Sequence, residues 1–195
     1  MGVPRIGEPR APALPATDDQ ENRRGAILRA AARLGAAKEL ERIQAQEIAA
    51  DAGVALRTLY RYYPSKHHVF AAVLTDQVAR FRPPQPTGNR IDDIVAIMVE
   101  ACRNVLRYKH LAHAMITSTQ VVRAQTHEPE DPTLALRILA VAGIDEPSED
   151  QLRRLRLVQQ ATTGILTWAV GGALAPEDAL ADVDLACRLL VDGAF

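Results

Sequence analysis

Apolar residues recur every three or four positions through most of the chain. In the first such segment Ile27, Ala30, Ala31 and Leu34 stand at i, i+3, i+4 and i+7, the spacing of one buried helix face. No segment alternates apolar and polar residues as a strand does. The composition agrees, since 33 residues are alanine, the best helix former, and only 4% are aromatic. The pattern predicts an all-α protein.

Capping residues and breakers divide this pattern into about nine helices. Thr17 and Asp18 offer N-caps, with Gln20 and Glu21 three residues further on, as in a capping box. Gly53 suits the left-handed position after a helix, and prolines or glycines separate most later segments. The predicted helices span about 19–37, 44–52, 55–62, 64–81, 91–108, 111–126, 133–142, 149–175 and 177–192.

Proline-rich stretches predict the division into domains. Residues 1–18 hold four prolines and no apolar period, which favours a disordered arm. Residues 82–88 read Arg-Pro-Pro-Gln-Pro-Thr-Gly, a clear break. We therefore expect a first domain over 19–82 and a second over 83–195.

Several classes of protein are disfavoured by composition. The two cysteines, Cys102 and Cys187, are too few and too distant for a disulfide scaffold. Residues 157–176 are nearly uncharged, but their polar groups and glycines disfavour a membrane span. Prolines stand where a signal peptide would be apolar, so we expect a cytoplasmic protein without membrane contact. His110 and His113 lack acidic or cysteine neighbours, so no metal or other cofactor is expected.

Charge is distributed unevenly between the two expected domains. Residues 19–82 carry 11 basic and 7 acidic side chains, whereas residues 83–195 carry 10 basic and 15 acidic ones. Such an asymmetry indicates that only the first domain meets a polyanion, although an excess this small also arises by chance.

The segment from Glu47 to Lys66 concentrates hydrogen-bond donors. A short helix is followed by a turn at Gly53 and by a second short helix rich in Arg, Thr and Tyr. This arrangement is a helix-turn-helix, whose second helix is shaped to enter the DNA major groove.

The details of this segment resemble the DNA-binding domain of the TetR/AcrR family of bacterial transcriptional regulators. The resemblance extends from Arg23 to Leu74 and is carried by Ile48-Ala49, Ala52-Gly53-Val54, Thr58-Leu59-Tyr60, Tyr62-Tyr63 and Ser65-Lys66. Three positions depart from the family pattern: Ala55 replaces a capping serine, Arg57 a small residue and Gln44 a threonine. The resemblance implies a homodimer whose second domain binds a small ligand.

The same resemblance implies roles in DNA binding. Tyr60, Lys66 and Gln44 would contact phosphates, and Gln46, Arg57, Thr58, Arg61 and Tyr62 would contact base edges or nearby phosphates. Arg23 and Arg24 would hold the flanking backbone, and Arg5 and Arg10 of the arm would reach a minor groove. Alternatively, Tyr60 and Tyr62 are core aromatics and the arginines form a solvated face.

For the second domain, helical spacing supplies candidates for a pocket and for a dimer interface. The pocket candidates are Met98, Cys102, Val105, His113, Met115, Thr119 and Trp168, although ordinary core packing would produce the same pattern. The dimer candidates, expected to form a four-helix bundle with a second chain, are Leu155, Val158, Thr162, Ile165, Leu166, Ala169, Leu180, Val183, Cys187 and Leu190. Burial of these faces within one chain is the alternative.

The sequence thus predicts a ligand-responsive repressor that binds a pseudo-palindromic double-stranded DNA operator and is released by a small hydrophobic effector. Residues 57–66, with Ile43-Gln44, are also similar to actinobacterial repressors of sterol catabolism, which implies a steroid or an acyl-CoA as effector. An activator or a ligand-independent DNA-binding protein is the alternative. A helical enzyme is disfavoured, because no catalytic motif is present.

Overall fold

The computed structural model describes residues 17–126 and 132–195. Within them the chain forms helices and no strand, which confirms the all-α prediction. The elements are α1 (Asp18–Ala37), η1 (Leu40–Arg42), α2 (Ala45–Asp51), α3 (Leu56–Tyr62), α4 (Lys66–Arg80), α5 (Arg90–Leu106), α6 (Lys109–Gln125), α7 (Thr133–Val141), α8 (Glu149–Val170) and α9 (Pro176–Val191). The eighth helix ends earlier than expected, and a 3-10 turn occupies part of an expected connection.

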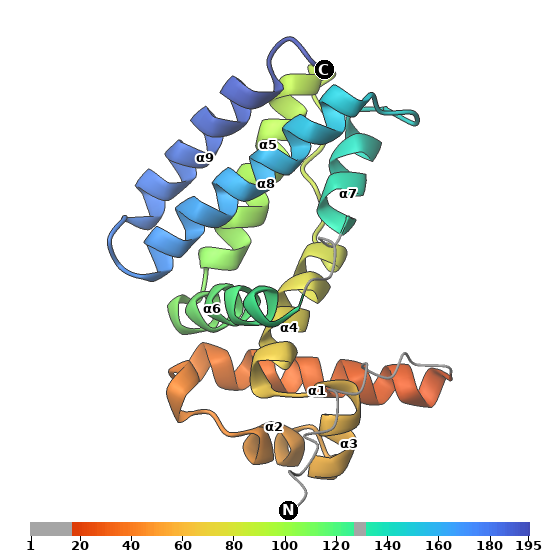
Figure 1. Cartoon of the computed structure of the whole chain (residues 1–195), viewed down its shortest axis with the longest axis vertical. Helices are drawn as coiled ribbons and strands as arrows, with labels where there is room; N and C mark the ends of the chain where they lie inside the picture. The colour runs from red at the N-terminus through yellow and green to blue at the C-terminus, as the bar shows by residue number, and fades with distance from the viewer. Residues whose placement is uncertain (1–16, 127–131) are drawn as a thin grey trace, which may run out of the picture.

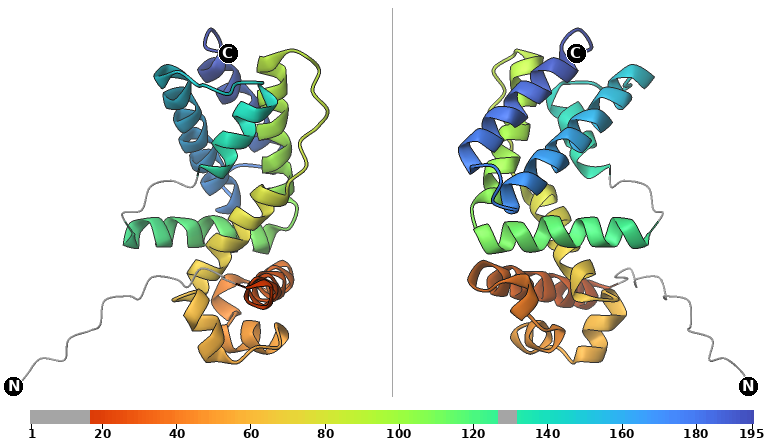
Figure 2. Two further views of the ribbon diagram at one scale, coloured as in Figure 1. Left: turned by 90° about the vertical axis from the view of Figure 1, so that its right-hand side faces the viewer. Right: turned by 60° about the vertical axis from the view of Figure 1, so that its left-hand side comes forward.

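The helices form two bodies joined by α4. In Figure 1, α1, α2 and α3 lie at one end of the molecule, and α5, α7, α8 and α9 form a bundle at the other. Helix α6 crosses between them, and α4 runs from the first body into the second (Figure 2). Residues 81–89 then connect α4 to α5 without helix. Within the described residues, no helix is both long and apolar enough to cross a membrane.

Local chemistry explains where the helices begin. The Thr17 hydroxyl accepts a bond from the Gln20 backbone amide, and the Asn89 side chain accepts bonds from the backbone amides of Ile91 and Asp92 in the first turn of α5. Ser148 and Gln151 form the capping box at the start of α8. Because the first amides of a helix lack carbonyl partners, each of these caps satisfies donors that would otherwise be unpaired.

The buried polar group Asp93 locks the loop before α5. Its carboxylate accepts bonds from the Thr87 amide at 2.6 Å, the Thr87 hydroxyl at 2.8 Å and the Gly88 amide at 3.2 Å. These bonds to the charged form lower the pKa of Asp93, the Thr87 amide contributing most. The end of the connection between α4 and α5 is therefore held by a single carboxylate.

Helix α1 lies close to both α4 and α6 at Gly35. A Cβ atom built on Gly35 would lie 2.8 Å from the Phe70 ring of α4 and 2.9 Å from the Leu111 side chain of α6. Phe70 is completely buried and Leu111 nearly so. Glycine is therefore required here by the distance between helices, and not by backbone conformation.

We expect Gly35→Ala to lower the free energy of unfolding by about 1–3 kcal/mol, as overpacking in a filled core does. The matched control is Gly25→Ala in the same helix, where the added Cβ meets only the flexible end of Arg29. The control should be neutral or stabilising by up to about 1 kcal/mol, because alanine is the better helix former. Urea unfolding followed by circular dichroism measures both, and equal effects would contradict the account of Gly35.

Candidate nucleic-acid interface and pocket

Helices α2 and α3 form the helix-turn-helix expected from the sequence. Gly53 adopts φ +67°, a left-handed conformation that a side chain disfavours, and the Val54 amide bonds the Ala49 carbonyl at 2.9 Å. Leu59 is completely buried beneath α3, and Ala55 begins this helix without a side-chain cap. The turn therefore presents one face of α3 to the outside.

An ion pair and a backbone bond fix the start of α2. Glu47 pairs with Lys38 at 2.7 Å and accepts a bond from the Gln44 amide at 3.1 Å. Both interactions favour the carboxylate, and the pKa of Glu47 is lowered chiefly by the bond from Lys38. The polar side chain of Gln44 thus stands at a fixed N-terminus of α2.

Four of the expected phosphate or base contacts line one open hollow in front of α2 and α3. Gln44, Gln46, Tyr60 and Lys66 contribute to it, together with Glu41, Ile43, Ala45, Pro64 and Ser65. Gln44 and Gln46 are exposed, and Tyr60 is 46% exposed. The fold therefore brings together residues from both sides of the turn on a single surface.

Lys66 has a structural role that the sequence did not predict. Its ammonium donates to the Leu40 carbonyl at 2.8 Å and to the Ile43 carbonyl at 3.1 Å. Only one of its three donors remains for a phosphate. Lys66 therefore ties the first turn of α4 to the segment that leads into α2, in addition to facing the hollow.

Tyr62 corrects the sequence prediction. It is 2% exposed and belongs to the core, so it is not available to read bases. The reason is helical spacing, because Leu59 and Tyr62 lie three residues apart on the buried side of α3. Arg61 is exposed; its guanidinium lies 5.1 Å from the Tyr62 ring centroid and donates to the Tyr62 hydroxyl at 3.3 Å. Arg57 is exposed and Thr58 half-buried on α3.

The arginines at the start of α1 lie beside carboxylates of the same helix. Arg23 pairs with Asp19 at 4.0 Å, and Arg24 pairs with Glu21 at 3.2 Å. Arg24 also lies near Tyr63, whose burial raises its pKa to about 12 although the guanidinium opposes the shift. Arg5 and Arg10 lie outside the described residues.

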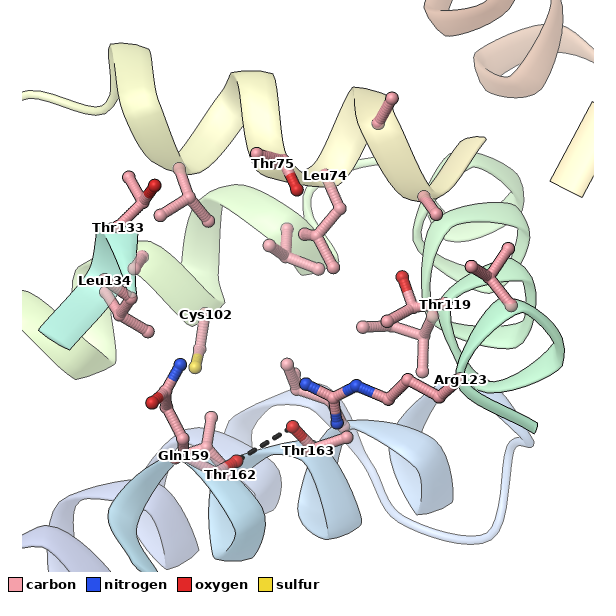
Figure 3. Close-up of a pocket in the computed structure, with 18 of the residues that line it drawn as sticks. Leu74, Thr75, Cys102, Thr119, Arg123, Thr133, Leu134, Gln159, Thr162 and Thr163 are labelled. Carbon is pink, nitrogen blue, oxygen red and sulfur yellow. Dashed lines mark hydrogen bonds between the residues drawn. The ribbon is translucent and has the colours of Figure 1, made fainter. Parts of the chain in front are cut away.

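An apolar pocket of about 340 Å³ lies where α4 and α6 meet the bundle of the second body (Figure 3). Its wall is built from five helices: α4 supplies Leu74, Thr75 and Val78, α7 supplies Thr133 and Leu134, and the remaining groups come from α5, α6 and α8. Of the expected pocket residues, four line it: Met98, Cys102, Val105 and Thr119.

Three of the expected pocket residues lie elsewhere. Met115 is completely buried in the core, His113 is half-buried on α6 without lining the pocket, and Trp168 is 66% exposed on the outer face of α8. Residues of α4, α7 and the inner face of α8, such as Gln159 and Thr163, take their places. The sequence carries no sign that helices so far apart along the chain share one wall.

The pocket chemistry suits an apolar molecule with few polar groups. Threonine hydroxyls and the Gln159 amide are the main uncharged polar groups, and Arg123 is the one charged side chain among the described lining residues. Thr119 and Thr163 already donate to the Met115 and Gln159 carbonyls of their own helices. Burial raises the pKa of the Cys102 thiol to about 12, so it is neutral and packs as an apolar group.

Six of the ten residues expected at the dimer interface are covered within the chain, and for the other four the interface stays a prediction. Leu155, Val158, Thr162, Leu166, Val183 and Cys187 are buried, and Ile165, Ala169, Leu180 and Leu190 are partly buried. Thr162 and Leu166 line the pocket. Helix α8 carries a second apolar stripe on its opposite face, with Leu157 at 41% and Trp168 at 66% exposed. Inspection of both faces, and not only the stronger one, would have found it.

Comparison with known proteins places this architecture in a family. A model described as bacterial regulatory proteins, tetR family, matches residues 27–73, and one described as tetracyclin repressor-like, C-terminal domain, matches residues 88–190. The second match alone covers over half of the chain. The protein belongs to the TetR family. It is a DNA-binding transcriptional regulator, as the helix-turn-helix predicted.

Individual proteins similar to this TetR-family regulator are also transcriptional regulators. The HTH-type transcriptional repressor KstR of Rhodococcus jostii is 31% identical over 156 residues, or 76% of this chain and 74% of that protein. KstR of Mycobacterium tuberculosis is 27% identical over 185 residues, or 90% of this chain and 83% of that protein. A TetR transcriptional regulator from Rhodococcus sp. RHA1 has 36% identity and a TM-score of 0.80, covering 92% of this chain and 100% of that chain.

The two neighbouring tyrosines of α3 in this TetR-family regulator should respond differently to truncation. We expect Tyr62→Ala to lower the free energy of unfolding by about 3–5 kcal/mol, as loss of a buried aromatic ring does. Tyr60→Ala should change it by no more than about 0.5 kcal/mol, because the side chain is half in solvent. Chemical denaturation measures both variants. A large loss at Tyr60 with none at Tyr62 would reverse the assignment.

Proposed function

We propose that the chain is a repressor that binds a pseudo-palindromic operator as a homodimer and releases it when an apolar effector occupies the pocket. The observation that carries this proposal is that α4 joins the helix-turn-helix at one end to the pocket wall at the other. Lys66 lies in its first turn and Thr75 and Val78 in its second half. A regulator of this kind acts at the chromosome, so the proposed location is the cytoplasm.

For DNA recognition the proposal assigns base contacts to the exposed arginines of α3. Arg57 and Arg61 lie one helical turn apart, so both face the same side of the helix. A guanidinium pairs with guanine through two parallel hydrogen bonds in the major groove. Tyr60 and Gln44 line the hollow in front of α2 and α3 and supply contacts to phosphates.

For dimerisation the proposal uses the outer faces of α8 and α9. Leu157 and Trp168 of α8 and Leu185 and Leu189 of α9 are between 41% and 71% exposed. So much large apolar surface on two adjacent helices is unusual on a monomer. Two copies related by a two-fold axis would bury it in a four-helix bundle and set two recognition helices one DNA turn apart.

For the effector the proposal names an apolar body with few hydrogen-bonding groups. A cavity of about 340 Å³ lies at the lower end of the range for small-molecule sites. Its described lining holds no carboxylate, so a cation has no partner there. The similarity to repressors of sterol catabolism implies a steroid or an acyl thioester, whose apolar part fits this chemistry.

The DNA contacts are tested by capture and sequencing of sheared genomic DNA on the purified protein. We expect recovery of one or a few palindromic sites. Arg57→Ala and Arg61→Ala should each cost about 1–3 kcal/mol of discrimination for the recovered site. The matched control, Arg103→Ala, removes an exposed arginine of α5 and should leave binding unchanged. Uniform recovery that disappears at moderate salt would indicate counterion-driven binding alone and contradict the proposal.

The dimer surface is tested by Leu185→Asp, which places a charge in the proposed interface and should yield monomers in sedimentation equilibrium. Leu136→Asp is the matched control, because Leu136 is a 60% exposed leucine on α7, away from this surface. The control should remain dimeric. A Leu185→Asp variant that sediments as a dimer would place the interface elsewhere.

A further inference from the structure

A cationic side chain donates to backbone carbonyls at each end of helix α4. At the start, the Lys66 ammonium reaches the Leu40 and Ile43 carbonyls. At the end, the Arg137 guanidinium of α7 donates to the Ala79 carbonyl at 2.5 Å and to the Phe81 carbonyl. The last carbonyls of a helix have no amide partners and carry the negative end of its dipole. A guanidinium at this position therefore donates hydrogen bonds to these carbonyls and also compensates the dipole.

Aromatic packing adds to the contact between Arg137 and α4. The guanidinium lies 5.9 Å from the centroid of the Phe81 ring, while it donates to the carbonyl of the same residue. A planar guanidinium with several fixed donors can make these contacts together, which a lysine ammonium cannot reproduce. The direction of the end of α4 is therefore set by one side chain of α7.

The contact between Arg137 and α4 lies beside the pocket. Thr133 and Leu134 line the pocket and precede Arg137 by one helical turn, so all three lie along one side of α7. On α4, Thr75 and Val78 line the pocket directly before Ala79. A molecule in the pocket therefore touches both helices that Arg137 joins.

We propose that Arg137 is a positioning residue that holds α4 in the DNA-binding arrangement and transmits occupancy of the pocket to it. A molecule that displaces the first turn of α7 separates the guanidinium from the end of α4. Helix α4 then shifts, and Lys66 passes the shift to Ile43, two residues before the start of α2. An effector acts by preferring the state in which this contact is broken. This inference rests on the proposed function.

The test measures the distance between two spin labels within one chain, by pulsed electron resonance. Ala50 of α2 and Arg153 of α8 are exposed and are replaced by cysteine to carry the labels. The native Cys102 and Cys187 are buried, with pKa values raised to about 12, so they stay unlabelled in the folded protein. Dilution with unlabelled chains removes distances between copies.

Three variants separate transmission from simple stabilisation. Arg137→Gln should broaden or shift the distance distribution, and Arg137→Lys should return it part-way towards the parent. Leu134→Trp enlarges a side chain of α7 inside the pocket and stands in for an effector; it should shift the distribution in the parent. In the Arg137→Gln background Leu134→Trp should add nothing further, because the contact is already lost. Arg103→Gln is the control and should match the parent.

Two results would overturn the inference. One is an Arg137→Gln protein that melts at a lower temperature but keeps the parent distribution, which would leave Arg137 a purely stabilising cap. The other is a shift of the distance distribution by Leu134→Trp that has the same size in the parent and in the Arg137→Gln background. If the Arg137→Gln variant does not fold, the same comparison is made in the Arg137→Lys background. Neither readout needs DNA, so failure of the proposed repressor function is seen separately, as absence of a captured site.

An operator fragment recovered by capture provides a second readout. We expect Arg137→Gln to weaken binding at least about tenfold while the dependence of affinity on salt keeps its slope, because no phosphate contact is removed. Unchanged affinity together with an unchanged distance distribution would refute the positioning role. A lower slope would instead assign Arg137 to direct DNA contact.

Discussion

The packing of α4 against α1 and α6 is the constraint on which the rest of the structure depends. Val69, Phe70 and Val73 are buried on this helix, and Phe70 fills the space that Gly35 leaves open on α1. Since interiors are close-packed, neither body can rotate about α4 without opening a cavity or forcing an overlap. Any movement of the helix-turn-helix relative to the second body therefore involves a movement of α4.

As a consequence, polar side chains near α4 hold packed helices together, even where their residue type and position in the sequence suggest a contact to a ligand. Lys66 has the residue type and position of a phosphate contact, yet two of its donors hold backbone carbonyls. His67 likewise lies within 3.1 Å of the fully buried Ser118 hydroxyl of α6, and burial lowers its pKa. Polar contacts of this kind orient packed helices, because hydrogen bonds are directional whereas apolar packing is not.

Apolar residues of helices α5, α6 and α8 lie in three different environments: a filled core, a pocket and an exposed face. Met115 lies in the core, Cys102 faces the pocket and Trp168 faces outward, although all three are apolar residues on amphipathic helices. Helix α8 contributes to all of them, with Leu155 in the core, Leu166 on the pocket and Leu157 outside. Helix α8 is therefore apolar on more than one side.

Local rules were sufficient to determine the helices and the helix-turn-helix from the sequence. Period, caps and breakers depend on residues within a few positions of each other, so Thr17, Gly53 and Ser148 could be interpreted without the fold. The motif around Thr58-Leu59-Tyr60 was likewise sufficient to indicate the family. Only the tertiary structure decided which face of a helix meets which neighbour. Tyr62 lies in the core, six of the ten expected dimer residues are covered within the chain, and α4, α7 and α8 line one pocket. These outcomes depend on packing between residues distant along the chain, where two apolar stripes of one helix are equivalent until the other helices are in place.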